Sequence, residues 1–459
     1  MPSFYRYSKV PLYNNTMRYA YLLIFLVCSL LGINTAHAQY VTTIAGNGIW
    51  GYSGDGGPAT MASLKYIRDV AVDDSGNVFI SGEEGNCIRK INTNGIITCF
   101  AGIPGNSGFS GDNGPATNAQ ITYCMGLGVD KKGNLYIADF ANQRIRKVDA
   151  FGIITTIAGN GGIGYTGDNG PATNATMHDP NDAACDKWGN VYFTDDLNNC
   201  IRKIDTSGII TTVAGTGIEG QTGDNGPATA AQITRPLKLD TDTFGNVYFT
   251  TRCVVRKIDL NGIITTIAGN GTGGCSGDEG PATAAQIASE GIAIGVNGYI
   301  YTSEQTFRCV REITSDGIIH RIAGVPTMAG YSGDGGPATA AVFVFTPGVA
   351  VDRDGYVYIV DQTNYRIRKT YQHTINVENA DVQVKATTYP SPCNGSFILQ
   401  ITTAQPGAIP IYLIDMTGRI VHSEQVLPNQ PRAIATSLPT GIYAIYTTGT
   451  YLGNITIEH

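Results

Sequence analysis

Short runs of β-forming residues, separated by turn residues, fill most of this chain. Residues 180–186, 190–194, 200–204 and 209–215 are such runs of five to seven residues, and the turns between them contain Asp, Asn or Gly. These residues suit tight turns because they accept a positive φ or bond their own backbone. The pattern predicts a four-stranded antiparallel meander.

The meander recurs together with a signature loop, Ser/Thr-Gly-Asp-x-Gly-Pro-Ala-Thr, that precedes each copy. The aspartates of the loop stand 54 to 57 residues apart and are Asp55, Asp112, Asp168, Asp224, Asp278 and Asp334. A fixed period of this length indicates a repeat architecture. Six meanders predict an all-β fold, a six-bladed β-propeller with four-stranded blades. Solenoid repeats are usually shorter, and a β-sandwich does not need six near-identical units.

The ends of the repeat region predict how the ring closes. A fourth-strand phrase occurs at residues 41–46, before any first strand that it could follow. The last unit supplies only three strands, at residues 348–352, 356–360 and 365–369. We therefore expect the N-terminal strand to complete the last blade, which leaves no open sheet edge.

The repeated string Gly-Asn-Val-Tyr-Phe/Ile-Thr/Ala-Asp-x-x-Asn-x-x-Ile-Arg-Lys-Ile/Val-Asp resembles the NHL repeat family. Residues 133–149 and 189–205 carry it most clearly, and the resemblance covers about residues 40 to 372. The Gly-Asp-x-Gly-Pro-Ala-Thr insert is similar to that of bacterial NHL proteins that carry it in every blade. The resemblance implies a propeller that binds a partner or serves as a scaffold.

Charge and composition narrow the partners. Charged residues make up 15% of the chain, glycine is abundant at 58 residues, and the formal net charge is −7. This balance suits short strands and gives no electrostatic reason to expect nucleic acid or an anionic membrane.

The N-terminus reads as a secretory signal, residues 1–38. Arg18 precedes the apolar run 21–33, and Ala36-His37-Ala38 supplies a cleavage pattern before Gln39. The run is too short for a comfortable membrane span, so no transmembrane segment is expected. Nine cysteines remain after cleavage, in a compartment that permits disulfides.

The C-terminal region has a different pattern. We expect the propeller at residues 39–373, a linker at 374–383 and a small β-sandwich at 384–459, because strands of period two alternate there with Gly/Pro turns. Motifs at Pro390, Gly418 and Gly441 are similar, in this order, to the type A sorting domain of type IX secretion cargo in Bacteroidetes. The resemblance implies the type IX machinery as partner and a secreted or outer-surface location. The alternative is an ordinary adhesion-like sandwich.

Two repeated charges allow more than one interpretation. The six signature aspartates could attract cations, but an aspartate that bonds its own turn explains them without a ligand, and no calcium-loop spacing is present. Arginines also recur, at positions 89, 146, 202, 256, 311 and 368. They suggest an anion or RNA surface, or pairing with a repeat carboxylate such as Asp130, Asp186 or Asp352; the acidic net charge favours pairing.

Broken symmetry marks the candidate site. The turn between strands two and three reads Asp-x-x-Asn in blades 2, 3 and 6, whereas blades 1, 4 and 5 depart from it. A ligand face there would use Glu83, Glu84, Arg252, Glu304, Phe307 and Arg308. Its ligand would be a protein or a glycan, and neutral drift of the repeats is the alternative.

An enzyme is the second functional class. A lyase or lactonase-like propeller would hold calcium or zinc at the channel mouth, where His178 is a candidate neighbour. The histidines of the propeller share no repeat position, and no nucleophile elbow or phosphate loop occurs, so we assign no catalytic residue and no cofactor.

The cysteines provide a test of strand register. Cys87 and Cys99 lie symmetrically about the turn 92–95. We expect them to face each other on adjacent antiparallel strands and to form a disulfide.

Overall fold

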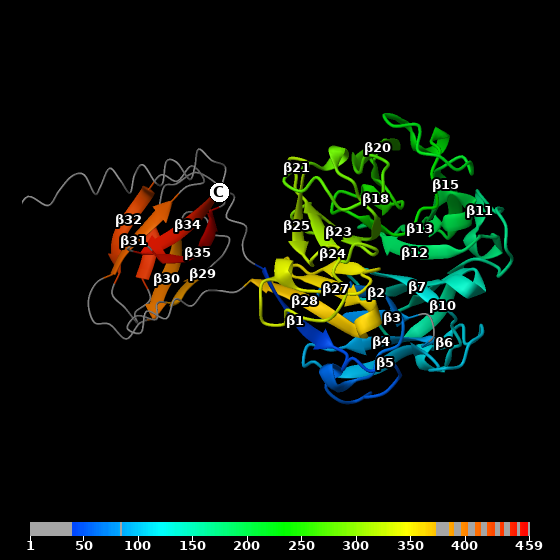
Figure 1. Ribbon diagram of the computed structural model, residues 1–459, viewed down its shortest axis with the longest axis horizontal. Coiled ribbons are helices and arrows are strands. Elements are labelled where there is room, and N and C mark those ends of the chain that lie inside the picture. Colours follow the sequence, from blue (N-terminus) through cyan, green and yellow to red (C-terminus); the bar gives the residue numbers. More distant parts are fainter. Residues whose placement is uncertain are drawn as a thin grey trace, which may run out of the picture. The chain divides into compact units, whose positions relative to one another are not determined.

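The computed structural model describes residues 39–82 and 85–372, together with seven strands between residues 385 and 457 (Figure 1). The chain divides into two compact units, Met1–His373 and Thr374–His459. The expected signal segment, residues 1–38, and the expected linker, residues 374–383, lie outside the described residues. No helix within the described part of the chain is long and apolar enough to cross a membrane.

The first unit is a ring of six antiparallel sheets, which confirms the predicted six-bladed propeller. Each inner strand contacts the inner strand of the next blade, and the last contacts the first. The inner strands therefore surround a common axis, and the labels of β2, β7 and β12 lie toward the centre of the propeller in Figure 1. In blade order they are β2 (Ile67–Val72), β7 (Cys124–Val129), β12 (Pro180–Cys185), β17 (Leu239–Thr241), β22 (Ser289–Ile294) and β26 (Val349–Val351).

The second and third strands of each blade carry most of the core. Their apolar residues pack between neighbouring blades, as when Phe193 of blade 3 packs near Tyr136 of blade 2. The second strands are β3 (Val78–Gly82), β8 (Leu135–Asp139), β13 (Val191–Asp195), β18 (Val247–Thr250), β23 (Ile300–Glu304) and β27 (Val357–Asp361). The third strands are β4 (Cys87–Ile91), β9 (Arg144–Val148), β14 (Cys200–Ile204), β19 (Val255–Ile258), β24 (Cys309–Ile313) and β28 (Arg366–Gln372).

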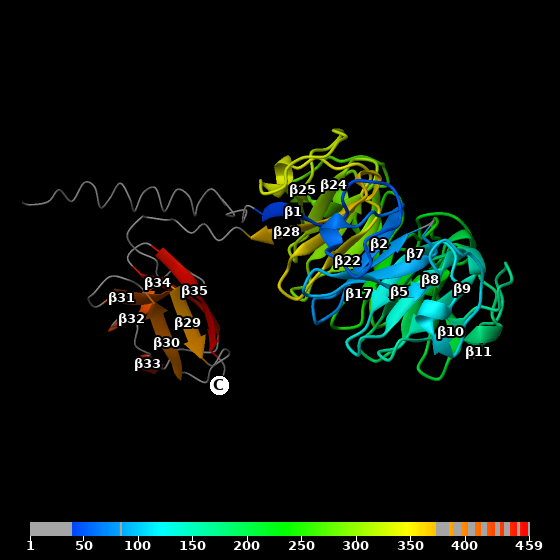
Figure 2. The ribbon, with the colours of Figure 1, turned by 90° about the horizontal axis from the view of Figure 1, so that it is seen from below.

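The outer strand of the last blade comes from the N-terminal end of the propeller. β1 (Gln39–Ala45) pairs with β28, with Val41 opposite Thr370 and Thr43 opposite Arg368, and the two strands lie side by side in Figure 2. The predicted closure is therefore confirmed. The other outer strands are β5 (Ile97–Gly102), β10 (Ile153–Ala158), β15 (Ile209–Ala214), β20 (Ile263–Ala268) and β25 (Ile318–Ala323).

Each signature loop covers the outer edge of the blade that follows it. In blades 2 to 5 its Gly-Pro pair adds a short fifth strand, and in blades 1 and 6 the proline forms an isolated bridge to the outer strand. The short strands are β6 (Gly114–Pro115), β11 (Gly170–Pro171), β16 (Gly226–Pro227) and β21 (Gly280–Pro281). Backbone groups that an edge strand would expose are thereby paired.

Single turns of 3-10 helix complete the propeller. Six follow the signature proline, and three form the turns between the second and third strands of blades 2, 3 and 6. The first group comprises η1 (Ala59–Met61), η2 (Ala116–Asn118), η4 (Ala172–Asn174), η6 (Ala228–Ala230), η7 (Ala282–Ala284) and η8 (Ala338–Ala340). The second group comprises η3 (Phe140–Asn142), η5 (Asp196–Asn198) and η9 (Gln362–Asn364).

The second unit is also built of strands. Its described strands form two antiparallel sheets, in the orders β29-β30-β33 and β32-β31-β34-β35. They are β29 (Lys385–Tyr389), β30 (Ser396–Thr402), β31 (Ile409–Ile414), β32 (Ile420–Val426), β33 (Arg432–Ala435), β34 (Gly441–Thr447) and β35 (Thr450–Ile457). The all-β class predicted for the chain is confirmed. Of the motif positions, Gly441 begins β34, whereas Pro390 and Gly418 lie outside the described residues.

Candidate functional site

Each blade buries one arginine of its third strand against the aspartate of its signature loop. In blade 3, Arg202 Nη2 donates to Asp168 Oδ1 at 2.7 Å and to the carbonyl of Thr166 at 2.8 Å, while Nη1 donates to the carbonyl of Thr176 at 2.8 Å. The six nitrogen–oxygen distances are 2.6 to 2.8 Å, and no arginine side chain is more than 5% exposed. We call this set the arginine ring: Arg89–Asp55, Arg146–Asp112, Arg202–Asp168, Arg256–Asp224, Arg311–Asp278 and Arg368–Asp334.

The expected partners of the arginines are wrong, although pairing with a repeat carboxylate is right. Asp130 and Asp186 instead close their own turns. Asp130 Oδ1 accepts from the backbone N–H of Lys132 and of Asn134, both at 2.9 Å. Asp352 closes its turn in the same way. The arginines are buried, so they present no anion or RNA surface.

The signature aspartates also hold the outer strand of their blade. Asp168 Oδ2 accepts from the backbone N–H of Thr212 at 3.1 Å, and Asp112 Oδ2 accepts from the hydroxyl of Thr156 at 2.7 Å. Gly167 lies so close to Ala175 that a Cβ on the glycine would come within 2.7 Å of its Cα. These contacts give the signature loop a structural role, as a clasp between the third and fourth strands.

A second buried carboxylate ends the second strand in blades 2, 3 and 6. Asp195 Oδ1 accepts from the backbone N–H of His178 at 2.7 Å and from Asn198 Nδ2 at 2.9 Å. Asn198 Nδ2 also donates to the carbonyl of Gly164 in the long loop, at 2.8 Å. Burial raises the pKa of Asp195, and of the equivalent Asp139 and Asp361, to about 6. The Asp-x-x-Asn turn therefore lies on the face of the long loops, which we call the mouth face.

The residues predicted to form a ligand face differ in their exposure to solvent. Glu304 is fully buried in place of the aspartate, and it accepts from the backbone N–H of Ala288 and from Ser289 Oγ. Burial raises the pKa of Glu304 to about 7. Glu304 therefore does not reach the surface. Arg252 is exposed, Phe307 and Arg308 are half-buried, and Glu83 and Glu84 lie outside the described residues.

The register on which the predicted Cys87–Cys99 disulfide rested is wrong, so the disulfide itself stays a prediction. The two thiols still contact each other, because a hydrogen bond with Cys99 is the first cause of the raised pKa of Cys87. A β-bulge between Ile88 and Arg89 shifts the pairing, so Cys87 lies opposite Gly102 and Cys99 lies opposite Arg89. Symmetry about the turn could not reveal the extra residue that a bulge inserts into one strand.

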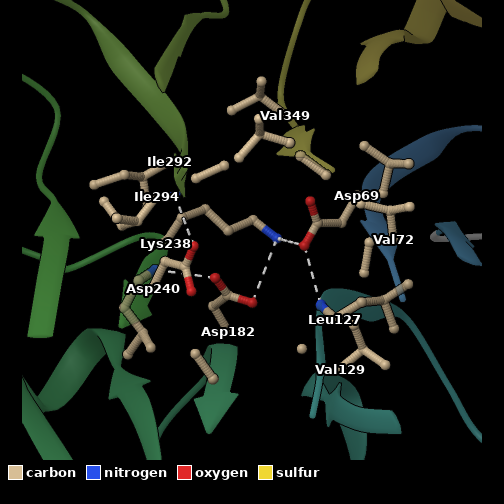
Figure 3. A pocket seen from close by; sticks show the side chains of 18 residues that line it. Asp69, Val72, Leu127, Val129, Asp182, Lys238, Asp240, Ile292, Ile294 and Val349 are labelled. Carbon is tan, nitrogen blue, oxygen red and sulfur yellow. Dashed lines mark hydrogen bonds and ion pairs between the residues drawn. The ribbon is translucent and has the colours of Figure 1, made fainter. Parts of the chain in front are cut away.

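The channel ring breaks the sixfold repeat most strongly. At the equivalent position near the start of the inner strands, the six blades carry Asp69, Gly126, Asp182, Lys238, Gly291 and Gly348. Lys238 comes from the fourth blade and reaches across the axis toward the first. Its Nζ donates to Asp69 Oδ2 at 2.8 Å and to the carbonyl of Met125 at 2.7 Å, and lies 3.9 Å from Asp182 Oδ1 (Figure 3).

Glycines make room for this bridge. A Cβ on Gly126 would lie 2.1 Å from Asp182 Oδ1, and one on Gly348 would lie 2.7 Å from Asp69 Oδ1. The charged and glycine positions therefore depend on one another. Together they close the channel with a buried ion pair that ties blade 4 to blades 1 and 2.

The electrostatics of the channel ring are dominated by burial. The pKa of Asp182 is raised to about 8, because burial and the charge of nearby Asp69 together outweigh the opposing effect of Lys238. Burial also raises the pKa of Asp69 despite the opposing effect of Lys238. For Lys238 burial favours the neutral amine, but Asp182 and Asp69 outweigh burial and raise its pKa. The lysine stays charged, while Asp182 Oδ1 is buried without a hydrogen-bond partner.

A cavity of about 150 Å³ lies along the axis at the channel ring (Figure 3). Aliphatic side chains such as Val72, Val129 and Ile294 line it together with Asp240. Asp240 Oδ2 accepts from the backbone N–H of Ile294 at 2.8 Å, and burial raises the pKa of Asp240 to about 6. The cavity is smaller than the pockets of about 300 Å³ or more that usually hold organic ligands.

The mouth ring stands at the entrance of this channel. In five blades the residue three positions before the channel-ring residue has a positive φ; these residues are Tyr66, Tyr123, Asp179, Arg235 and Phe345, with φ of 32°, 51°, 59°, 39° and 53°. Asp179 and Arg235 are tied to the turn of the preceding blade, to Gln143 and Asn199 respectively. The aromatic members are 39 to 44% exposed. They come from the consecutive blades 6, 1 and 2, so we call them the aromatic arc.

The histidines and acids of the mouth face do not assemble into a metal centre. Among residues 39–82 and 85–372, no group of three or more His, Cys, Asp or Glu side chains could hold a metal ion. His178 precedes Asp179; its backbone N–H donates to Asp195 Oδ1, and its carbonyl accepts from the backbone N–H of Leu197. His320 Nδ1 lies 2.8 Å from Glu279 Oε2, on an outer strand.

Sequence reasoning missed both the channel ring and the aromatic arc. It compared the turns between the second and third strands, where the blades differ over the longest stretch of sequence. An alignment of the six inner strands, position by position, would have shown Lys238 and two aspartates in a column that is otherwise glycine. The aromatic residues just before these strands would have stood out in the same alignment.

Two kinds of relatives match this chain. The family model described as the teneurin NHL domain matches residues 101–166, 163–220 and 323–430. Human teneurin-4 is 25% identical over 436 residues, which are 86% of this chain and 14% of teneurin-4. Mouse teneurin-3 is 28% identical over 322 residues, which are 62% of this chain and 12% of teneurin-3. The chain thus spans about a seventh of the length of these relatives.

Solved structures share the fold. A protein of unknown function from Bacteroides thetaiotaomicron has a TM-score of 0.54 and 19% identity, and an auxiliary nutrient binding protein from Bacteroides ovatus has a TM-score of 0.53 and 15% identity. Each comparison covers 72% of this chain and 76% of the other. At these identities the likeness shows a common propeller architecture.

Proposed function

We propose that this NHL-repeat six-bladed β-propeller, whose repeats are similar to the teneurin NHL domain, is an exported binding module with its ligand on the mouth face. The observation that carries the proposal is that the repeated charged residues are bonded within their blades, whereas the aromatic residues at the mouth are exposed. The arginine ring and the signature aspartates are consumed in contacts within each blade. The aromatic arc is exposed at the channel mouth and differs from blade to blade.

A protein or a glycan is the class of ligand that this face supports. The blade edges are capped by the signature loops and the channel is closed by Lys238, so the binding surface is the rim of the mouth rather than a deep pocket. Loops on a rigid scaffold are the usual place for such a surface.

Arrays of proteins and glycans, probed with the purified full-length protein, test the proposal. Binding should be lost or weakened in Tyr123→Asn, which removes a ring of the arc but tolerates the left-handed backbone. Phe244→Ala is the matched control, because Phe244 is 68% exposed in the turn after the inner strand of blade 4, at the opposite face. Binding that survives Tyr123→Asn and is lost in Phe244→Ala would place the ligand on the wrong face and refute the proposal.

The export route is a separate part of the proposal. The motifs at Pro390, Gly418 and Gly441 support recognition of residues 384–459 by the type IX secretion machinery, after Sec-dependent entry into the periplasm. Deletion of residues 384–459 should leave the propeller in the periplasm of a Bacteroidetes host, and fusion of these residues to a periplasmic carrier should export the carrier. A deleted protein that still reaches the cell surface would contradict this route.

A further inference from the structure

Four exposed aromatic side chains gather around blades 6, 1 and 2 of the mouth face. The three members of the aromatic arc, Phe345, Tyr66 and Tyr123, are joined by Trp50 of the first signature segment, which is 50% exposed. Trp50 is bridged to Leu64, two residues before Tyr66, and Lys65 Nζ lies 4.7 Å from the centre of its ring. Large exposed apolar groups gathered on one face of a protein mark an interaction site.

The backbone conformation of the aromatic arc supports a role of its rings in binding a ligand. Tyrosine and phenylalanine are rare at positive φ, where glycine or asparagine costs less. Blades 3 and 4 have the same left-handed geometry with Asp179 and Arg235, so the fold requires the conformation but not the ring. Strain retained at a partly exposed residue, where the fold accepts other side chains, points to function.

Polar groups lie directly inside the arc. Arg68 is the second residue after Tyr66 and pairs across the mouth with Glu290, at 3.5 Å; their side chains are 22% and 18% exposed. Arg308 occupies the same turn position in blade 5 as Gln143 in blade 2 and Asn199 in blade 3. Gln143 and Asn199 each bond the mouth residue of the next blade. The mouth residue of the blade after Arg308 is Phe345. The buried Arg308 Nε has no hydrogen-bond partner.

We propose that the aromatic arc binds a neutral oligosaccharide, a proposal that rests on the binding role proposed above. A pyranose ring offers an apolar C–H face that stacks on an aromatic ring and an edge of hydroxyls that hydrogen-bond to charged groups. Arg68, Glu290 and Arg308 supply such donors and acceptors beside the rings. Exposed aromatics with adjacent polar groups match this ligand in chemistry.

Other macromolecules fit the mouth less well. An extended peptide needs a free sheet edge or a long apolar groove, and the signature loops cover the outer edge of each of the six blades. A nucleic acid would meet a chain of net charge −7 whose arginine ring is buried.

Tryptophan fluorescence gives a local test, because the chain has only two tryptophans, Trp50 beside the aromatic arc and Trp188 in the turn after the inner strand of blade 3. In full-length Trp188→Phe, the emission of Trp50 should change and saturate when malto-, cello-, manno- or chito-oligosaccharides are titrated. In full-length Trp50→Phe, the emission of Trp188 should stay constant with the same sugars. Tyr123→Asn in the Trp188→Phe background should weaken binding about tenfold, as expected for the loss of one stacked ring.

The outcomes separate this inference from the proposed function. If none of the oligosaccharides changes Trp50 emission and a protein binds the arc instead, the glycan inference is wrong while the binding role stands. If Tyr123→Asn leaves binding of both arrays unchanged, the mouth face is not the site and both fail. If Trp188 responds and Trp50 does not, the sugar binds elsewhere and the inference is overturned.

Blade 5 carries a second feature that depends on a different observation. Cys275 Sγ and Cys309 Sγ are 3.0 Å apart, about 1 Å beyond the length of a disulfide bond. Cys275 stands where blades 1, 2, 3 and 6 have an aromatic residue that stacks on the repeat arginine, as Tyr165 does on Arg202 at 5.2 Å. Blade 5 therefore lacks a stacking contact that ties the signature loop to the third strand.

We infer that Cys275 and Cys309 form a disulfide that replaces this contact. The bond forms by thiol–disulfide exchange with a protein or glutathione disulfide: each cysteine loses its proton, the two sulfurs bond, and the two electrons reduce the oxidant to its thiols. The hydrogen bond with Cys309 lowers the pKa of Cys275, which favours its thiolate as the attacking group.

Peptide mapping after incubation of the purified full-length protein with glutathione disulfide decides this inference. The expected product is a cross-linked peptide pair containing Cys275 and Cys309, which disappears in Cys275→Ser. The oxidised protein should melt about 5 °C or more above the same protein after reduction. Alkylation of both cysteines after oxidation, or a pair that joins either of them to another cysteine, would overturn it.

Discussion

The arginine ring and the channel ring show opposite uses of the same sixfold repeat. In the arginine ring, six blades repeat one contact with distances of 2.6 to 2.8 Å. In the channel ring, three blades carry charge and three carry glycine, and a single lysine bridges them. Contacts kept in every blade therefore stabilise the individual blade, whereas the positions that differ join particular blades at the channel and form the surface of the mouth.

Opening the ring should have the largest effect. Removal of residues 39–46 deletes the outer strand of the last blade and exposes the edge of β28. We expect a loss of thermal stability so large that the protein aggregates or fails to give a cooperative melting transition. Calorimetry or circular dichroism measures it, and a truncated protein that melts like the parent would show that another segment closes the blade.

Breaking one member of the arginine ring should come next. Arg202→Met removes the donor to Asp168 and the donors to the carbonyls of Thr166 and Thr176. It also leaves the buried carboxylate of Asp195 without the cation that lies 3.6 Å away. The expected cost is about 3 kcal/mol, typical of a buried pair that loses one partner. Chemical denaturation provides the measurement, and a loss below about 1 kcal/mol would show that the ring is not what holds the blade.

Breaking the channel ring should cost less. Lys238→Met removes the bridge, but Asp69 and Asp182 have raised pKa values and can take up protons instead of remaining as unpaired charges. We expect a loss of about 2 kcal/mol by the same denaturation assay. If Lys238→Met destabilises the protein more than Arg202→Met does, the channel ring contributes more to stability than the arginine ring, which contradicts this account.

The smallest expected effect is the change in stability over a single pH unit, through the protonation of Asp182. Because the folded-state pKa of Asp182 is about 8 and that of an unfolded aspartate is near 4, the native protein holds an extra proton between these values. Stability should therefore fall as pH rises from about 4 to 8, by at most about 1.4 kcal/mol per unit for this group. Asp182→Asn should flatten the slope above pH 6, where Asp240→Asn should not, since the pKa of Asp240 is about 6. Equal slopes in the parent and Asp182→Asn would contradict the assignment.

Much of the fold was predictable because it depends on period and local chemistry. The turn residues fix the four-stranded meander, and the unpaired strand phrase at the N-terminus identifies the closure through β1 and β28. The arginine partners were not predictable in the same way. Asp168 lies 34 residues before Arg202 and reaches it only because the signature loop folds back over its own blade.

The site was less predictable, since it depends on distances across the axis. Lys238 and Asp69 are 169 residues apart, and only closure of the ring brings them together. Glu304 shows the converse difficulty. It was singled out because it departs from the repeat, yet its buried carboxylate accepts a backbone hydrogen bond as the usual aspartate does. A changed residue is informative about function only when its side chain reaches the surface.

Two variants of one blade test the central claim most directly. Asp112 and Tyr123 lie in the same loop of blade 2, one bonded to Arg146 at 2.8 Å and the other 44% exposed at the mouth. Melting temperature and ligand binding should be measured on Asp112→Asn and Tyr123→Asn side by side. We predict that Asp112→Asn melts several degrees lower, by about 3 °C or more, and binds like the parent below its transition, whereas Tyr123→Asn melts like the parent and loses binding. The reverse pattern would contradict the division between repeated contacts that stabilise the propeller and unrepeated ones that bind.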